Sequence, residues 1–409
     1  MINSGDTAWV LISSALVLLM TPGLAFFYAG MVRKKNVLSV LMQCFIIMCV
    51  LGIQWVLFGY SLSFAPGRGF WGGFTWMGLK GVGFEPYADY AGTIPHQAFM
   101  IYQAMFAIIT PALIIGAFAE RMKFSAFILF TLLWATFVYD PLCHWVWGMG
   151  GFLKKMGALD FAGGTVVHIN AGIAALVTAI VLGKRVNLDK NIPTPHNMPL
   201  VVLGTGLLWF GWFGFNAGSA LAANGLAVNA FVVTNTAAAA AGLSWAAIEW
   251  MRNGKPTIFG ACSGIVAGLV AITPAAGFVS VIPAIIIGAL VSVFCFTAVT
   301  VLKPRLGYDD SLDAFGVHCV GGIWGALATG LFASKLVNPA GADGLFFGNP
   351  KQFFVQALTV LVTIGYTFIA TLVIYKLIDV LLGVRVKAEE ELIGLDLTQH
   401  HERAYTVLE

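Results

Sequence analysis

Two histidines stand out among the residues of this chain that could carry chemistry. His168 lies in DFAGGTVVHINAG and His318 in DAFGVHCVGGIWG, and both segments belong to long apolar stretches. An ionisable side chain within such a stretch is costly and indicates a functional site. A neutral imidazole has one donor and one acceptor nitrogen, so a pair of them can line a narrow pore and pass a proton. The alternative is a pair of neutral histidines satisfied by packing hydrogen bonds.

The surroundings of the two histidines match at an offset of 150 residues. The matching residues are Val167 with Val317, Gly172 with Gly322, and Asp160 with Asp310. Two further matches are AIITPA at 107–112 with AITPA at 271–275, and FYAG at 27–30 with FNAG at 215–218. Their order pairs a first set of five apolar spans with a second set. Because five is odd, the second set must be inverted in a membrane, as in many transporters, whose substrate site lies between the repeats. We therefore expect the two imidazoles to lie close together, where they could share a hydrogen bond.

Bis-histidine haem ligation is a second functional interpretation of the pair. The flanking glycines and small residues favour a narrow lumen over a pocket for a macrocycle. A Soret band from the purified protein would decide for haem. The sequence predicts no cofactor and no metal site.

The acidic residues near the histidines have two interpretations. Asp160 precedes the span of His168 and is expected either to cap a helix N-terminus or to act through its field on a nearby cation. Asp310 and Asp313 precede the span of His318, where capping is the commoner role.

Aromatic residues are abundant, with 32 Phe and 12 Trp, and aromatic faces could hold a desolvated cation. Composition alone does not select which of them would do so.

The composition places these residues in a membrane protein. Of 409 residues, 59% are hydrophobic and 10% are charged, whereas a soluble domain has roughly 25% charged residues. No basic run suggests nucleic acid, and the six cysteines show no paired spacing, so we interpret them as packing residues. No nucleophile elbow, metal-ligand cluster or carboxylate pair occurs in a span, so the sequence predicts no enzyme.

Windows of about 20 apolar residues predict an all-α polytopic protein with eleven transmembrane helices. The windows are 7–32, 37–64, 96–119, 124–148, 162–183, 198–219, 227–251, 257–275, 278–302, 312–333 and 353–382. The membrane domain is thus 1–382, with inverted repeats at about 7–183 and 198–333 and a last helix at about 353–382. A charged tail follows at 383–409. The stretch 65–95 is expected to be an interfacial loop.

Basic residues set the predicted orientation. Sixteen of the 22 fall on one side: Arg33, Lys34, Lys35, Arg121, Lys123, Lys184, Arg185, Lys190, Arg252, Lys255, Lys303, Arg305, Lys376, Arg385, Lys387 and Arg403. The other six are Arg68, Lys80, Lys154, Lys155, Lys335 and Lys351. The sequence therefore predicts an N-terminus outside and a C-terminus inside the cell membrane. Lys154 and Lys155 lie on the side where positive charge is scarce, and the sequence offers no account of them.

Four long motifs closely resemble those of the ammonium transporter family (Amt/Mep, related to the Rhesus proteins), in its bacterial Amt branch. They are DFAGGTVVHINAG at 160–172, GWFGFNAGSA at 211–220, GACSGIVAGLVAITPA at 260–275 and DDSLDAFGVH at 309–318. The resemblance runs from FFYAGMVRKKNVLS near the start to GLDLTQHHERAY in the tail. It implies a homotrimer in the lipid bilayer whose subunits each have a narrow hydrophobic pore for ammonium or ammonia.

The resemblance also implies roles for particular residues. Trp147, Phe106 and Ser219 match an outer site that recruits ammonium, and Phe106 and Phe215 match two stacked rings that close the pore. His168 and His318 match the paired pore histidines, and Asp160 matches an acidic residue that supports the recruitment site indirectly. The implied mechanism is deprotonation of ammonium, conduction of ammonia and a proton relay through the histidines, hence electrogenic transport.

Two implications concern partners. In the family the tail packs against the inner face, couples the subunits and helps a PII signalling trimer to block the pore; a solvated terminus is the alternative. The tail has HHE at 400–402, where relatives usually have Gly in the middle position. Some family members are sensors with attached signalling domains, so an ammonium-sensing receptor of the same fold is the alternative function.

Overall fold

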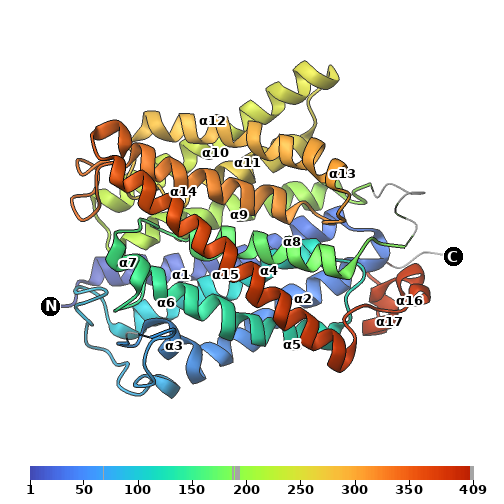
Figure 1. Ribbon diagram of the computed structural model, residues 1–409, viewed down its shortest axis with the longest axis horizontal. Coiled ribbons are helices and arrows are strands. Elements are labelled where there is room, and N and C mark those ends of the chain that lie inside the picture. Colours follow the sequence, from blue (N-terminus) through green and yellow to red (C-terminus); the bar gives the residue numbers. More distant parts are fainter. Residues whose placement is uncertain (68, 187, 189–193, 406–409) are drawn as a thin grey trace.

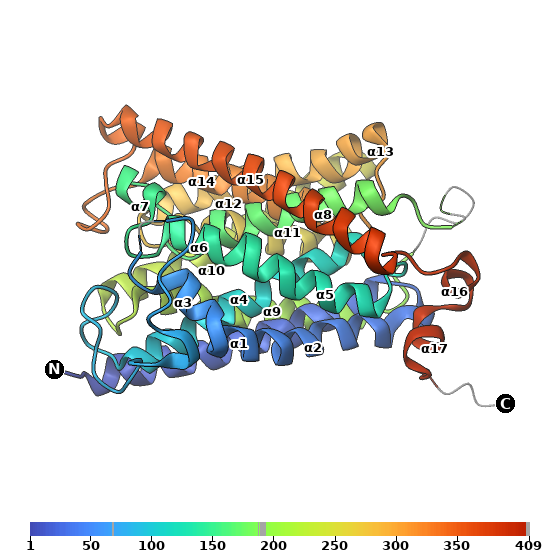
Figure 2. The ribbon, with the colours of Figure 1, turned by 60° about the horizontal axis from the view of Figure 1, so that its bottom comes forward.

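The structure is a computed structural model that describes residues 1–67, 69–186, 188 and 194–405. Long helices lie roughly side by side, and the chain begins at one end of the bundle while the last two helices lie at the other end (Figures 1 and 2). We call these the N-side and the tail side. The helices are α1 (Ser4–Met31), α2 (Val37–Gln54), α3 (Tyr60–Phe64), α4 (His96–Phe118), α5 (Phe124–Trp134), α6 (Asp140–Val146), α7 (Phe152–Met156), α8 (Asn170–Leu182), α9 (Met198–Ala217), α10 (Gly225–Asn253), α11 (Ile258–Ile272), α12 (Val281–Thr297), α13 (Lys303–Leu306), α14 (Val320–Phe332), α15 (Pro350–Leu382), α16 (Ala388–Ile393) and α17 (Leu395–His400).

Within the described residues, ten segments are long and apolar enough to cross a membrane. The predicted eighth span, 257–275, instead forms the shorter helix α11 of 15 residues. At 1.5 Å per residue α11 is about 22 Å long, less than the roughly 30 Å of a hydrocarbon core. It ends before Pro274, which has no N–H with which to continue the helix. The predicted all-α fold class is confirmed. The ten long segments, with or without the shorter α11, give about ten or eleven spans.

Among the described residues, five π-type turns interrupt the spans, and the sequence did not predict them. They cover Trp55–Gly59, Ala135–Tyr139, Gly164–Ile169, Ala298–Leu302 and Phe315–Cys319. Such turns occur frequently at functional sites. Two of them contain His168 and His318 and lead directly into α8 and α14.

Each of the two helices packs against the other helix's histidine-bearing turn through a matched glycine. A Cβ on Gly172 in α8 would lie 2.4 Å from the backbone nitrogen of Cys319, and one on Gly322 in α14 would lie 3.0 Å from the carbonyl oxygen of Gly164. The first distance excludes any side chain, and the second is tighter than ordinary contact. The glycines that matched in the sequence therefore lie where each helix meets the opposite turn.

The tail is folded against the tail side of the bundle as α16 and α17 (Figure 2). The carboxylate of Asp396 accepts a hydrogen bond of 2.8 Å from the backbone N–H of Ser39 at the start of α2, and Asn36 accepts one of 2.8 Å from Leu395. Residues 384 and 386 also bond to the loop at 121–123. The alternative of a solvated terminus is thus wrong for the described part of the tail. Arg68, Lys190 and the residues 406–409 lie outside the described residues.

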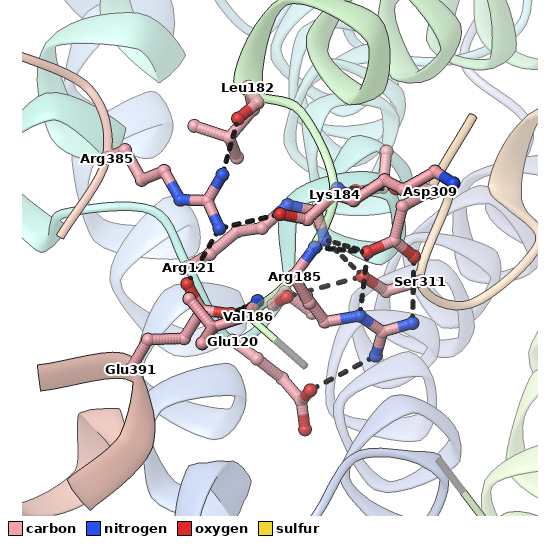
Figure 3. Close-up of polar contacts among 12 residues, drawn as sticks. Glu120, Arg121, Leu182, Lys184, Arg185, Val186, Asp309, Ser311, Arg385 and Glu391 are labelled. Atoms are coloured by element: carbon pink, nitrogen blue, oxygen red, sulfur yellow. Dashed lines mark hydrogen bonds and ion pairs between the residues drawn. The ribbon is translucent and has the colours of Figure 1, made fainter. Parts of the chain in front are cut away.

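A cluster of buried charges joins four loops beneath the tail (Figure 3). Arg185 pairs with Asp309 at 2.9 Å and with Glu120 at 3.1 Å, and Arg33 pairs with Glu120 at 2.8 Å. Arg121 also bonds to the backbone carbonyl of Asp309. Burial alone would raise the pKa values of Glu120 and Asp309, but the guanidinium groups outweigh it and hold both pKa values below their usual ranges.

We expect Arg185→Met to destabilise the fold by about 3–5 kcal/mol at pH 7, because it leaves two buried carboxylates short of their partner. In the wild type these carboxylates contribute stability above about pH 4, and this contribution is lost as the pH falls through their lowered pKa values. The thermal unfolding midpoint in detergent at pH 7 and pH 3.5 measures both effects. Arg305→Met, at an exposed site in α13, is the control. Equal midpoints for wild type and Arg185→Met at pH 7 would contradict the expectation.

Candidate functional site

Three cavities follow one another through the bundle. The N-side cavity, of about 400 Å³, is lined by residues from α4, α6 and the segment before α8. The central cavity, of about 50 Å³, has room for only a few water-sized molecules and is lined almost entirely by apolar side chains and the two histidines. The tail-side cavity is about 480 Å³. The central and tail-side cavities share the wall residues Met31, Phe259, Leu312 and Asp313.

Two buried phenylalanine rings separate the N-side cavity from the central cavity. Phe106, from α4, lines the N-side cavity, and Phe215, from α9, lines the central cavity. Their ring centroids are 4.4 Å apart, and the two residues are 1% and 0% exposed. These rings offer no oxygen atom to replace the hydration shell of a metal cation, so the geometry disfavours passage of a hydrated or bare alkali ion.

The structure brings His168 and His318 together at the central cavity. Their rings are nearly parallel, with an angle of 11° and centroids 5.4 Å apart. Among the residues that the structure describes, neither ring nitrogen of His168 has a hydrogen-bond partner, and Nδ1 of His318 has none either. The expected proximity is therefore present, but the expected hydrogen bond between the imidazoles is absent because the rings face each other in parallel. Their buried polar atoms remain available to a small molecule in the cavity.

The three residues matched to a recruitment site all line the N-side cavity. The Trp147 ring meets the Phe106 ring edge to face, with centroids 5.9 Å apart at 83°. The indole N–H of Trp147 donates to the backbone carbonyl of Asp160 at 2.8 Å, and this hydrogen bond fixes the ring. Ser219 donates to the carbonyl of Phe215 at 2.9 Å and lies 3.1 Å from the Tyr102 hydroxyl.

Asp160 is a cap for the turn that contains His168. Its two carboxylate oxygens accept four backbone N–H groups, from residues 163, 164, 165 and 166, at 2.7–3.1 Å. Burial raises the pKa of Asp160, while these four hydrogen bonds act in the opposite direction. Asp310 caps the second turn with a single hydrogen bond, which it accepts from the N–H of Phe315 at 2.8 Å. The capping interpretation is confirmed for both residues.

Sequence reasoning missed two residues of the site. The Trp212 ring stacks on His168 with centroids 5.4 Å apart, and its N–H donates to Thr273 at 2.9 Å. The Tyr102 hydroxyl donates to the backbone carbonyls of residues 214 and 215. These hydrogen bonds hold the segment of Phe215 in place. Trp212 precedes Phe215 by three positions, so helical spacing would have placed it on the same face. Tyr102 had no such signal.

The small central cavity also decides against haem. A haem held by both histidines would need a macrocycle between the imidazoles, and the rings, 5.4 Å apart, already face each other directly. The cavity of about 50 Å³ is far too small for such a group.

Comparisons with known proteins establish the family of the chain. The model of the family described as "Ammonium Transporter Family" matches residues 8–405. The chain belongs to the ammonium transporter family. It is 56% identical over 401 residues to an ammonium transporter of Bacillus subtilis strain 168, a match that covers 98% of both chains.

Solved structures of the family share the fold. The crystal structure of Candida albicans Mep2 matches with a TM-score of 0.90 and 38% identity, over 98% of this chain and 90% of that one. A structure described as a sensor Amt protein matches with a TM-score of 0.88 and 29% identity, over 97% of this chain and 98% of that one.

Proposed function

We propose that this chain transports ammonium across a membrane through its three consecutive cavities. The observation that carries the proposal is the buried pair of parallel imidazoles at a narrow apolar cavity, closed on the N-side by two phenylalanine rings. The names of the relatives point to the same substrate.

In the proposed mechanism, the N-side cavity recruits the ammonium ion. The face of Trp147, the ring of Phe106 and the hydroxyl of Ser219 form the recruitment site, where a desolvated cation–π contact is worth about 2 kcal/mol. Asp160 supports this site indirectly, because its own backbone carbonyl accepts the indole N–H of Trp147.

Ammonium then loses its proton, and ammonia passes the Phe106–Phe215 gate as a small neutral amine. In the central cavity, the unpartnered nitrogens of His168 and His318 supply hydrogen bonds to ammonia. The proton crosses separately: it is passed between the unpartnered imidazole nitrogens through a hydrogen-bonded molecule in the central cavity and recombines with ammonia on the tail side, so transport is electrogenic. A desolvated potassium ion would find no oxygen ligands at the gate and would be rejected.

The proposal includes a membrane topology. Eleven crossings are proposed, with α11 as the short eighth, the N-terminus outside and the tail inside the cell membrane. An odd number is supported by the chain beginning at one end of the bundle and α16 and α17 lying at the other (Figure 1). The inverted repeats at about 7–183 and 198–333, a homotrimer, and a PII-type regulator that binds the tail side are further parts of the proposal.

An ammonium-sensing receptor is the second candidate function, favoured by the likeness to a sensor Amt protein. The two candidates differ in flux. Purified chain in proteoliposomes, measured by solid-supported-membrane electrophysiology, is expected to give currents for ammonium and none for potassium. A chain that binds ammonium without any current or uptake would favour the sensor.

We expect Trp147→Leu to raise the half-saturating ammonium concentration about tenfold, because it removes the indole face from the recruitment site. The concentration dependence of the ammonium-evoked current measures this effect. Trp250→Leu, an exposed tryptophan near the end of α10, is the control. An unchanged half-saturating concentration in Trp147→Leu would remove this residue from the site.

A further inference from the structure

Lys154 places a positive charge in the cavity through which we propose that the cation enters. It belongs to the short helix α7, and it lines the N-side cavity together with Phe106, Trp147 and Ser219. The sequence offered no reason for a lysine on the side where basic residues are scarce. The structure shows that this side chain lines the same cavity as the recruitment residues and contacts the backbone of one of them, Trp147.

The ammonium group of Lys154 has two partners in the cavity wall. Its Nζ donates to the backbone carbonyl of Trp147 at 3.0 Å and lies 5.5 Å from the centroid of the Tyr90 ring. The Tyr90 ring is held in place, because its hydroxyl donates to the carbonyl of Phe64 and accepts from the N–H of Met149. A rigid aromatic face and a carbonyl oxygen are groups that bind a small ammonium cation.

The charge of Lys154 is not cancelled by a direct ion pair. Asp89 lines the same cavity, but no ion pair joins Lys154 to a carboxylate in the described part of the chain. The carboxylate of Asp160 is engaged by four backbone N–H groups. A cation that enters the cavity therefore meets a like charge that no direct ion pair neutralises and that Asp89 offsets only at longer range, and this charge repels it.

We propose that Lys154 is a tethered ammonium group that competes with the transported cation in the N-side cavity and so lowers its apparent affinity. Lys154 occupies a subsite made of the Tyr90 face and the Trp147 carbonyl, which would otherwise receive ammonium before it reaches the recruitment site. This inference rests on the proposed function and assigns to Lys154 a role in setting affinity.

The test is the half-saturating ammonium concentration of the current in proteoliposomes for three variants. Lys154→Gln removes the charge and keeps an amide that can donate to the Trp147 carbonyl, so we expect a half-saturating concentration about fivefold lower at low ionic strength. This gain should shrink as sodium chloride is added, since salt screens the repulsion. Lys154→Arg keeps the charge and should resemble the wild type. Lys155→Gln, the exposed neighbouring lysine, should also leave the value unchanged.

Three results would overturn the inference. An unchanged or raised half-saturating concentration in Lys154→Gln would indicate that Lys154 only supports the position of Trp147. An equal gain in Lys155→Gln would make the effect one of general surface charge. A gain that does not depend on salt would exclude the electrostatic origin. A wild type that gives no ammonium current at any concentration would instead overturn the proposed function, and the inference with it.

Discussion

The double variant His168→Ala, His318→Ala is expected to lose selective, electrogenic ammonium transport completely. The two imidazoles are buried in the wall of a largely apolar cavity, and their unpartnered nitrogens are groups that can bond to ammonia or carry its proton. Alanine replaces them with methyl groups that can do neither. The ammonium-evoked current in proteoliposomes measures this loss, and size-exclusion chromatography shows whether the assembly of the protein is preserved.

His196→Ala is a matched control for the double variant. His196 bonds to the carbonyl of Val32 at 2.8 Å and lies outside the three cavities, so its removal should leave the current and its selectivity intact. Ammonium currents of normal size and selectivity in the double histidine variant would refute the proposed relay.

Asp160→Ala is expected to destabilise the protein by about 3–5 kcal/mol and to abolish transport, because four buried N–H groups lose their acceptors at once. The turn from Gly164 to Ile169 carries His168, so loss of its cap should displace the imidazole from its partner. Asp160→Asn keeps one acceptor oxygen and should be less destabilised. Thermal unfolding midpoints and ammonium currents of the two variants measure these effects.

The control for this prediction is Asp89→Ala, which removes an exposed carboxylate from the same cavity. Its unfolding midpoint should equal that of the wild type. If Asp160→Ala keeps both the midpoint and the current of the wild type, the capping account is wrong. If Asp160→Asn keeps full stability but loses affinity for ammonium, the field of Asp160 on the cation, rather than its cap, is the dominant effect.

The repeat in the sequence allowed the centre of the molecule to be predicted. His168 and His318 were expected to meet because their surroundings match, and the matched Gly172 and Gly322 prove to be the positions at which each helix contacts the opposite turn. The matched Asp160 and Asp310 both cap these turns. These features repeat at a fixed offset, so a pattern in the sequence could reveal them.

Features that depend on packing show no such repeat in the sequence and could not be predicted from it. The π-type turns each add a residue to a helical turn, which hydrophobicity cannot reveal. The length of α11 depends on the turn at Pro274 rather than on apolar composition. His401 has φ of +56°, a left-handed conformation that glycine adopts more readily. The HHE motif suggested a departure there, but only the structure shows that a histidine adopts the conformation.

The account rests most directly on the claim that transport is electrogenic, so that a proton crosses the membrane for each ammonia molecule that passes. The measurement that tests this claim is the ratio of charge to nitrogen, from currents and uptake of ¹⁵N-labelled ammonium in the same proteoliposomes. We predict one positive charge for each nitrogen in the wild type. Uptake of nitrogen without any accompanying charge would contradict the account.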